Sequence, residues 1–472
     1  MLSKKLIAFL NVLSQKELDK LDSFIRSPYH NEQPELIRLY ALIRPSFENK
    51  KPTPSKLEVW NDLFPKKAYN DVKIRKLASL LLALAIEFKA LEILKEQPEQ
   101  KLLLELKAVS KPELTTHIAG INRKLQQLHQ KKGHNTIESH FFNYEFSIQN
   151  HKIIELTKNR KELLRLKDLH NANKHLDIFV LAKKLEIAAD IIGYQGFMQT
   201  NDAIRPQEIL EITKHSPFFD APIIRTYYLI VLMLSFPEDE SNFFELKNWL
   251  QNTPASFNKD QEKTFYAHLI NYCITHKINK GNERFLAEAF EIFTIMLDKK
   301  LIIDPFIDPD YYRNIISIGL QLKKYNYIQD FIQQYSELLP PDQKENAKTY
   351  NLARLYYTQK KYDRVLELLQ NVELTNVAYA LGAKSILVAT YYALDEYRAL
   401  DSLLVSFRVY VLRNRFLSKT AKQGYLNFLK FTKRLLHLAP YDHTRREKLK
   451  KKIETADSLM GRDWLLAQIN GG

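Results

Sequence analysis

The fold class is decided by the stretch NLARLYYTQKKYDRVLELLQ, residues 351–370, because SILVATYYALDEYRALDSLL at residues 385–404 repeats its pattern. In each stretch a Tyr-Tyr pair is followed five residues later by a single tyrosine, Tyr362 in the first and Tyr397 in the second. These two tyrosines are 35 residues apart, which gives the length of the repeat unit. A self-similar unit of this length is typical of stacked helical repeats.

A third copy of the unit, NIISIGLQLKKYNYIQDFIQQY, lies at residues 314–335 and places Tyr325 37 residues before Tyr362. Apolar residues at helical spacing lie on both sides of a polar turn, so each copy predicts a hairpin of two helices. The small residues Gly319 and Ala353 would let these helices approach closely. Neither helix can bury its apolar stripe alone, so we expect the hairpins to stack on one another.

Residues 308–407 resemble the tetratricopeptide repeat, in which a Leu-small pair, tyrosines and a small residue recur about every 34 residues. The residues that occupy these positions are Leu352, Ala353, Tyr356, Tyr362 and Val365. The copy departs from it at Thr349, where a tryptophan is usual, at Lys360, where a glycine is usual, and at Val365, where an alanine is usual. The resemblance implies an α-solenoid whose concave groove, lined by the first helices, binds a peptide.

Two stretches outside this segment resemble bacterial helical-repeat proteins of unknown activity. They are LDSFIRSPYHN at residues 21–31 and ITHKINKGNERF at residues 274–285. This second resemblance extends over much of the chain, but it implies no activity.

The predicted fold is all-α, with an N-terminal helical domain followed by an α-solenoid of stacked antiparallel helix pairs. Amphipathic patterns dominate, and no period-2 run predicts a strand. The expected parts are an N-terminal helical domain at 1–110, a long helical hairpin region at 111–200, tetratricopeptide-like repeats at 201–440, and a basic helix with a C-terminal capping helix at 441–472. Within the hairpin region the pattern predicts helices at about 113–132, 137–170 and 174–192.

The composition excludes several classes of protein. The 472 residues contain 11 glycines and one cysteine, Cys273, so a disulfide within the chain and a multi-cysteine zinc site are excluded. No Gly-rich phosphate-binding loop, nucleophile elbow or HExxH motif is present. The apolar runs are too short to span a membrane. We therefore expect a cytoplasmic protein that is not an enzyme and holds no cofactor.

The first helices of the three copies predict the lining of a peptide groove. The corresponding positions are Arg313, Ser317, Gln321, Tyr350, Arg354, Tyr357, Thr358, Ser385, Ala389 and Tyr392. Two arginines and three tyrosines suit an acidic or aromatic peptide. The alternative interpretation is that the tyrosines only pack between helices.

A carboxylate clamp, which some repeats of this kind use to hold a C-terminal carboxylate, is not expected. The five positions that resemble such a clamp are Arg313, Ser317, Asn351, Gly382 and Ile386. Arg313 and Asn351 are compatible with it, whereas the other three are not.

A basic segment covers residues 408–452, where 14 basic and 2 acidic residues give a charge of +12 within a chain of net charge +15. Four lysines fall within about 80° of one helix face at 100° per residue, and a second cluster follows them. The basic patch consists of Lys419, Lys422, Lys430, Lys433, Arg445, Arg446, Lys448, Lys450, Lys451 and Lys452. Nucleic acid, an acidic protein and a merely solvated face all remain open as explanations.

Three weaker signals favour ordinary structure over a site. The histidines between residues 117 and 175 lack the i, i+3 or i, i+4 spacing of a metal-binding helix. The stretch DPFIDPD at 304–310 lacks the glycine and glutamate of a calcium-binding loop. A helix-turn-helix drawn through residues 57–76 has too long a connection. No metal site is expected.

We therefore expect a non-enzymatic interaction scaffold that binds a protein or peptide, preferentially an acidic one, in the repeat groove. The alternative is a helical-repeat protein that binds RNA or DNA through the basic residues 408–452. The two hypotheses place the site on different surfaces, so changes in each surface distinguish them.

Overall fold

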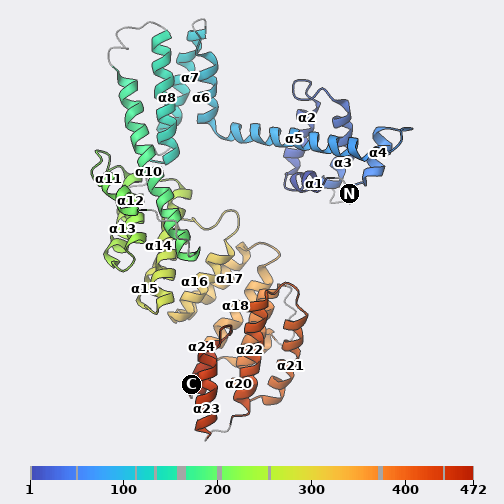
Figure 1. The fold of residues 1–472 in the computed structure, drawn as a ribbon, viewed down its shortest axis with the longest axis vertical. Coiled ribbons are helices and arrows are strands. Elements are labelled where there is room, and N and C mark those ends of the chain that lie inside the picture. The colour runs from blue at the N-terminus through green and yellow to red at the C-terminus, as the bar shows by residue number, and fades with distance from the viewer. Residues whose placement is uncertain are drawn as a thin grey trace. The chain divides into compact units, whose positions relative to one another are not determined.

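The computed structural model describes residues 3–48, 52–111, 114–131, 135–156, 166–198, 205–253, 257–369, 376–438 and 442–470. Throughout these ranges the regular elements are helices, and the extended backbone is limited to one isolated bridge between Ile303 and Ile307. The predicted all-α fold is therefore confirmed. Helices that follow one another in the chain pack against each other (Figure 1).

The chain divides into two compact units, residues 1–183 and residues 184–472. The boundary falls inside one long helix, α10 (Lys167–Met198). We describe each unit separately because each has its own apolar clusters.

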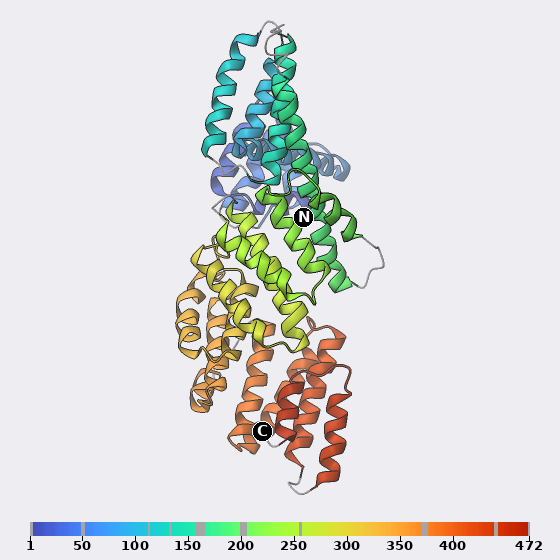
Figure 2. The same ribbon diagram turned by 90° about the vertical axis from the view of Figure 1, so that its left-hand side faces the viewer.

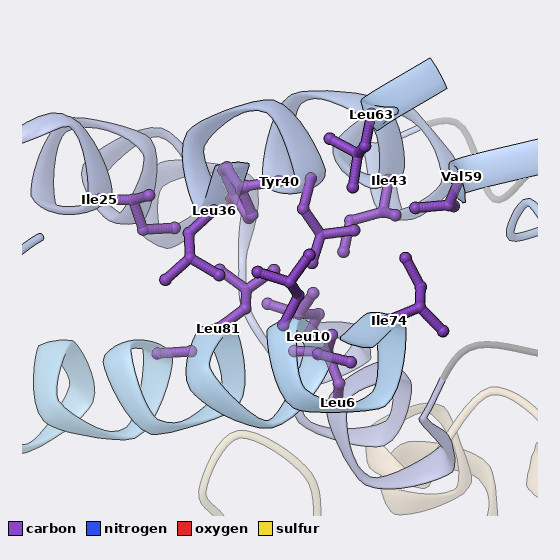
Figure 3. Close-up of a cluster of buried hydrophobic side chains, with 14 of the residues drawn as sticks. Leu6, Leu10, Ile25, Leu36, Tyr40, Ile43, Val59, Leu63, Ile74 and Leu81 are labelled. Atoms are coloured by element: carbon purple, nitrogen blue, oxygen red, sulfur yellow. The ribbon is translucent and has the colours of Figure 1, made fainter. Parts of the chain in front are cut away.

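Five helices form the first part of unit 1: α1 (Lys4–Asn11), α2 (Gln15–Arg26), α3 (Pro34–Glu48), α4 (Lys56–Leu63) and α5 (Asp71–Glu96). Side chains cap two of these helices at their N-termini, since Ser14 and Glu17 form a reciprocal capping box at α2, and Ser55 forms one with Glu58 at α4. The apolar faces of these helices point toward one another in a single core (Figure 3). Within this core the Tyr40 hydroxyl donates to the Leu18 carbonyl over 2.8 Å.

In the described part of unit 1, three more helices precede α10: α6 (Pro98–Val109), α7 (Thr115–Lys131) and α8 (Ile137–Leu156). Leucines of α6 pack with Ile118, Leu125 and Phe142 in a separate apolar cluster. The sequence pattern did not predict α6. The predicted helix 137–170 was wrong at its C-terminal end, because Leu166 has a left-handed backbone (φ 48°) and a new helix starts at Lys167.

The first part of unit 2 contains α11 (Pro206–Lys214), α12 (Pro222–Ser235), α13 (Glu240–Asn252), α14 (Lys259–Tyr272) and α15 (Arg284–Asp298). A short π-helical turn (Cys273–Lys277) and a 3₁₀ turn (Ile278–Lys280) separate the last two. Aromatic rings of three helices meet in this core, where Phe243 lies 5.3 Å from both Tyr272 and Phe285. The buried Lys247 amine is neutralised by Glu288 at 2.6 Å and Glu291 at 2.8 Å.

The predicted repeats form three helical hairpins. They are α16 (Pro309–Gln321) with α17 (Tyr325–Tyr335), α18 (Lys344–Thr358) with α19 (Tyr362–Leu369), and α20 (Val377–Ala393) with α21 (Tyr397–Arg413). Gly319 allows the close approach predicted for it, because a Cβ there would lie 2.6 Å from Ile328 Cγ1. Viewed in Figure 2, these helices follow one another in chain order within unit 2.

The first helix of each hairpin ends in the same way. Lys323, Lys360 and Asp395 have left-handed backbones, with φ of 57°, 59° and 57°. In each case the next amide donates to a carbonyl five residues earlier, as Lys361 does to Tyr356 over 2.9 Å. This is the Schellman cap, which usually contains glycine at the left-handed position. The repeated Tyr-Tyr pairs at 356–357 and 391–392 occupy equivalent places in it.

Three helices complete unit 2: α22 (Lys419–Leu436), α23 (His443–Glu454) and α24 (Arg462–Ile469). Leu465 and Ile469 of α24 are buried against the preceding helices. Trp464 lies 5.4 Å from the Tyr392 ring and 5.8 Å from the Phe428 ring. The last helix therefore covers apolar residues of α20 and α22, as expected of a capping helix.

Candidate functional site

A surface pocket of about 320 Å³ lies between α16, α18 and α20 in unit 2. Its polar wall consists of six residues predicted for the peptide groove: Ser317, Gln321, Tyr350, Arg354, Tyr357 and Thr358. Leu320 and Ile386 supply the apolar part of the lining. The repeat pattern thus brings first-helix residues from three hairpins to one place.

Arg354 is the charged group of this pocket, and its guanidinium has only neutral partners among the described residues. It donates to Ser317 Oγ over 3.1 Å and to Asn351 Oδ1 over 3.3 Å. It also lies over the Tyr350 ring, 5.7 Å from the ring centroid. A guanidinium has five N–H donors, so the half-buried Arg354 retains both charge and donors for an anionic ligand.

The two pocket tyrosines also pack between helices. Tyr350 covers Gly382, where a Cβ would lie 2.5 Å from the Tyr350 ring. Tyr357 lies 5.8 Å from the Tyr362 ring, and burial raises the pKa of Tyr357 to about 12. These two tyrosines therefore pack between helices and also line the pocket. Both rings are fixed in place by their neighbours before any ligand arrives.

Four predicted groove residues do not line the pocket. Arg313 is exposed and pairs with Asp310 at 2.9 Å, within its own helix. Ser385 donates to the Leu381 carbonyl over 2.9 Å, and Tyr392 packs against Trp464. Ala389 is buried. Helical periodicity could have identified the missed apolar residue Leu320, which lies one turn after Ser317 on α16.

The positions considered for a carboxylate clamp are engaged in structure. The Asn351 side-chain amide is buried and donates to the Ala347 carbonyl over 2.9 Å. Gly382 lies beneath the Tyr350 ring. Ser317 already accepts from Arg354. This geometry agrees with the expectation that the five-residue clamp is not formed.

The basic patch divides between exposed cations and structural ones. Lys419, Lys430, Lys433, Lys448, Lys451 and Lys452 are exposed. Arg446 donates to the Ile469 carbonyl over 3.3 Å, which ties α23 to α24. Arg445 pairs with Asp442 at 3.2 Å, and Lys422 donates to the Leu412 carbonyl. The half-buried Lys450 lies with the other lysines on α23.

The weaker signals lead to no site. No cluster of metal-binding side chains occurs in the described part of the chain, which leaves out His134 and the side chain of His129. Asp308 caps α16 by accepting from the Asp310 amide at 2.8 Å. Cys273 is buried, and burial raises the pKa of its thiol above the usual range. Lys56 and Arg75, near the proposed helix-turn-helix, both pair with Asp71.

Comparison of the sequence with models of protein families and with curated proteins finds no match. Among the helices that the structure describes, none is sufficiently long and apolar to cross a membrane. The function must therefore be argued from the geometry of the pocket and of the charged surfaces.

Proposed function

We propose that the chain is an interaction protein that binds an acidic peptide segment in the pocket between α16, α18 and α20. The observation that carries the proposal is Arg354, a half-buried guanidinium without a carboxylate partner among the described residues. A partner's Asp or Glu side chain would complete its hydrogen bonds. Such charge-assisted hydrogen bonds are shorter and stronger than neutral ones.

The wider architecture supports this proposal through the repeat. Three hairpins with the same Schellman cap, each with a tyrosine at the start of its second helix, are what a tetratricopeptide-like solenoid would contain. In such an array the first helices of successive hairpins line one surface. The proposed peptide would lie along this surface and place an acidic side chain at Arg354.

The rest of the lining favours an extended segment with an aromatic or apolar residue beside its acidic one. Leu320 and Ile386 provide an apolar surface, and the Tyr350 and Tyr357 rings provide stacking faces. Gln321 and Thr358 are exposed at the rim and can bond to the peptide backbone. A volume of about 320 Å³ accommodates one or two side chains and not a whole folded domain.

A display library of random peptides, selected on the immobilised full-length protein, tests the proposal. We expect the retained peptides to be enriched in Asp or Glu next to an aromatic residue. Arg354→Gln should weaken a selected peptide about tenfold or more, because a hydrogen bond to a charged group is worth about 1.5–3 kcal/mol. Arg354→Lys keeps the charge but loses the two-pronged geometry, so it should have an intermediate effect.

The matched control is Arg364→Gln on α19, which removes the same charge from an exposed residue paired with Glu367. It should leave peptide affinity unchanged. Enrichment of neutral or basic peptides, or equal losses for Arg354→Gln and Arg364→Gln, would contradict the proposal. Circular dichroism of each variant shows whether the helices are intact.

A further inference from the structure

The outer face of α21 carries a row of exposed apolar side chains that no helix covers in the described structure. Val405, Val409 and Leu412 are 62%, 41% and 50% exposed, and Phe416 in the following turn is 90% exposed. Val405, Val409 and Leu412 are spaced by four and three residues, which places them along one side of the helix axis. Phe416 follows the end of α21, beyond the extended backbone of Asn414. Isolated exposed apolar residues are ordinary, but an aligned row of three that is followed by an exposed phenylalanine is not.

This row lies away from the side of α21 that holds the helix in the fold. The buried residues of α21 are Leu400, Leu404, Phe407 and Val411, which pack in the core shared with α20 and α22. At 100° per residue the exposed row lies about 140° around the helix from them. Figure 1 shows α21 at the edge of this group of helices. The row therefore faces outward as a ridge.

Cations flank the ridge on both sides. Arg408 lies on one side and Arg413 on the other, at about 60–80° from the row by helix geometry. Arg415 lies in the bend after the helix, next to Phe416 in the sequence. All three are exposed, and none forms an ion pair with another described residue. Residues 402–441 contain eight Lys or Arg and no Asp or Glu. The acidic residue of α21, the exposed Asp401, lies one turn before Val405, at the end of the ridge remote from Arg413 and Arg415. Cations therefore outnumber the acidic group along the ridge.

We propose that the ridge of α21 and the turn at Phe416 bind the surface of an anionic phospholipid membrane. A helix with apolar residues on one face and cations beside them lies in the plane of the membrane interface. Its apolar side chains enter the boundary of the acyl chains, and the arginines pair with lipid phosphates. This surface is separate from the Arg354 pocket, so the proposal does not rest on peptide binding.

The shape of the ridge favours a lipid surface over the other anionic partners. A partner's acidic helix would need an apolar seam that matches this row, whereas lipids adapt to a single protruding helix without a matching shape. Nucleic acid would use the arginines through its phosphates but would leave the row of aliphatic side chains in water. A membrane surface uses both the aliphatic row and its flanking charges, and we therefore favour it over the other two partners.

Co-sedimentation of the full-length protein with vesicles tests this proposal. Vesicles of phosphatidylcholine with phosphatidylserine should bind the protein, and those of phosphatidylcholine alone should not. Binding should weaken as salt is raised, because screening reduces the attraction of the arginines to the surface. Arg413→Gln with Arg415→Gln should reduce partitioning about thirtyfold, at roughly tenfold or less per cation.

The apolar half of the proposal has its own variant. Leu412→Ser with Phe416→Ser should reduce partitioning by about tenfold or more while leaving the charge unchanged. The matched control is Lys451→Gln with Lys452→Gln on α23, which removes the same charge as the arginine pair and should change binding little. All six positions are exposed, and circular dichroism verifies that the variants remain folded.

Several results would overturn the proposal. One is the absence of binding to anionic vesicles; another is a loss in the α23 control equal to the loss in the arginine pair. If the apolar variant bound normally, cations alone would account for binding, as for a nucleic acid. If Leu412→Ser with Phe416→Ser bound vesicles normally but changed the molecular mass of the protein in solution, the ridge would be a contact between two copies of the chain. A blue-shifted emission of Phe416→Trp on anionic vesicles would be direct support.

Discussion

At the residue scale, Lys360 occupies a position where the tetratricopeptide pattern usually has a glycine, and its backbone conformation is strained. Its φ of 59° lies in the region that glycine adopts freely and other residues adopt at a cost of about 1–2 kcal/mol. Lys360→Gly should therefore stabilise the α18–α19 hairpin by about 0.5–1 kcal/mol, after the greater freedom of glycine in the unfolded chain is deducted. Hydrogen exchange of the amides in α18 and α19 measures this change locally.

The neighbouring Lys361 provides the control for this prediction. It follows the left-handed residue and precedes α19, and it is not among the residues with positive φ. Lys361→Gly relieves no backbone strain and only increases the conformational entropy of the unfolded chain. It should therefore lower the protection of the same amides against hydrogen exchange. Equal effects of Lys360→Gly and Lys361→Gly would show that the left-handed backbone carries no strain.

At the element scale, the helices that the sequence predicted well are those with both a periodic pattern and an explicit boundary. The helices on either side of the repeated turns before Tyr325, Tyr362 and Tyr397 are of this kind. The helix α6 was missed because its apolar periodicity is moderate and no capping side chain marks its start. It begins at Pro98, and the preceding Gln97 makes no capping hydrogen bond through its side chain. The break before α10 was missed because Leu166 is an unusual residue for a left-handed backbone.

Two ion pairs join α2 to α5 at this scale, Glu17 with Lys89 at 2.5 Å and Lys20 with Glu92 at 2.5 Å. Hydrogen bonds from Lys89 and from the Ser14 backbone lower the pKa of Glu17 from 4.5 to about 2. The carboxylate therefore stabilises the fold fully above pH 4.5 and loses this contribution as the pH falls toward 2. Glu17→Gln should reduce the stability of the α1–α5 region by about 1–2 kcal/mol at pH 7.

The pH dependence distinguishes this ion pair from a simple loss of packing. The difference in stability between the parent protein and Glu17→Gln should shrink as the pH is lowered through 4.5 toward 2, because the parent then loses its own carboxylate charge. Hydrogen exchange of α2 amides across this range is the measurement. A difference that stayed constant with pH would mean that the side chain acts through its shape alone.

At the scale of the whole molecule, part of the candidate site was predictable because the repeat sets which first-helix residues share a surface. Ser317, Tyr350 and Arg354 belong to successive hairpins or turns of that pattern, and the structure brings them together. Arg313 and Tyr392 were predicted from the same pattern, which takes no account of the side chains that surround them in the fold. Asp310 pairs with the first and Trp464 packs on the second, and pairings of this kind are not visible in repeat spacing.

The proposed array of hairpins in unit 2 predicts that damage to one hairpin stays local. In an array whose helices contact mainly their neighbours in the chain, stability is close to a sum of hairpin and nearest-neighbour contributions. Gly319→Ala places a methyl group 2.6 Å from Ile328 Cγ1, so we expect a loss of about 1–3 kcal/mol in the α16–α17 hairpin. Hydrogen exchange should accelerate there and, less strongly, in α15 and α18.

The amides of α1–α5 serve as the internal reference for this experiment, since they belong to the other unit. Gly120→Ala, at a helical glycine where the new methyl group would lie more than 4 Å from any atom other than its adjacent residues and the nearby backbone of its own helix, is the matched substitution and should slow exchange slightly in α7. If Gly319→Ala accelerated exchange in α1–α5 as much as in α16–α17, the whole chain would unfold as one cooperative body. The proposed array would then be wrong, because its stability depends on contacts between neighbouring hairpins rather than on one shared core.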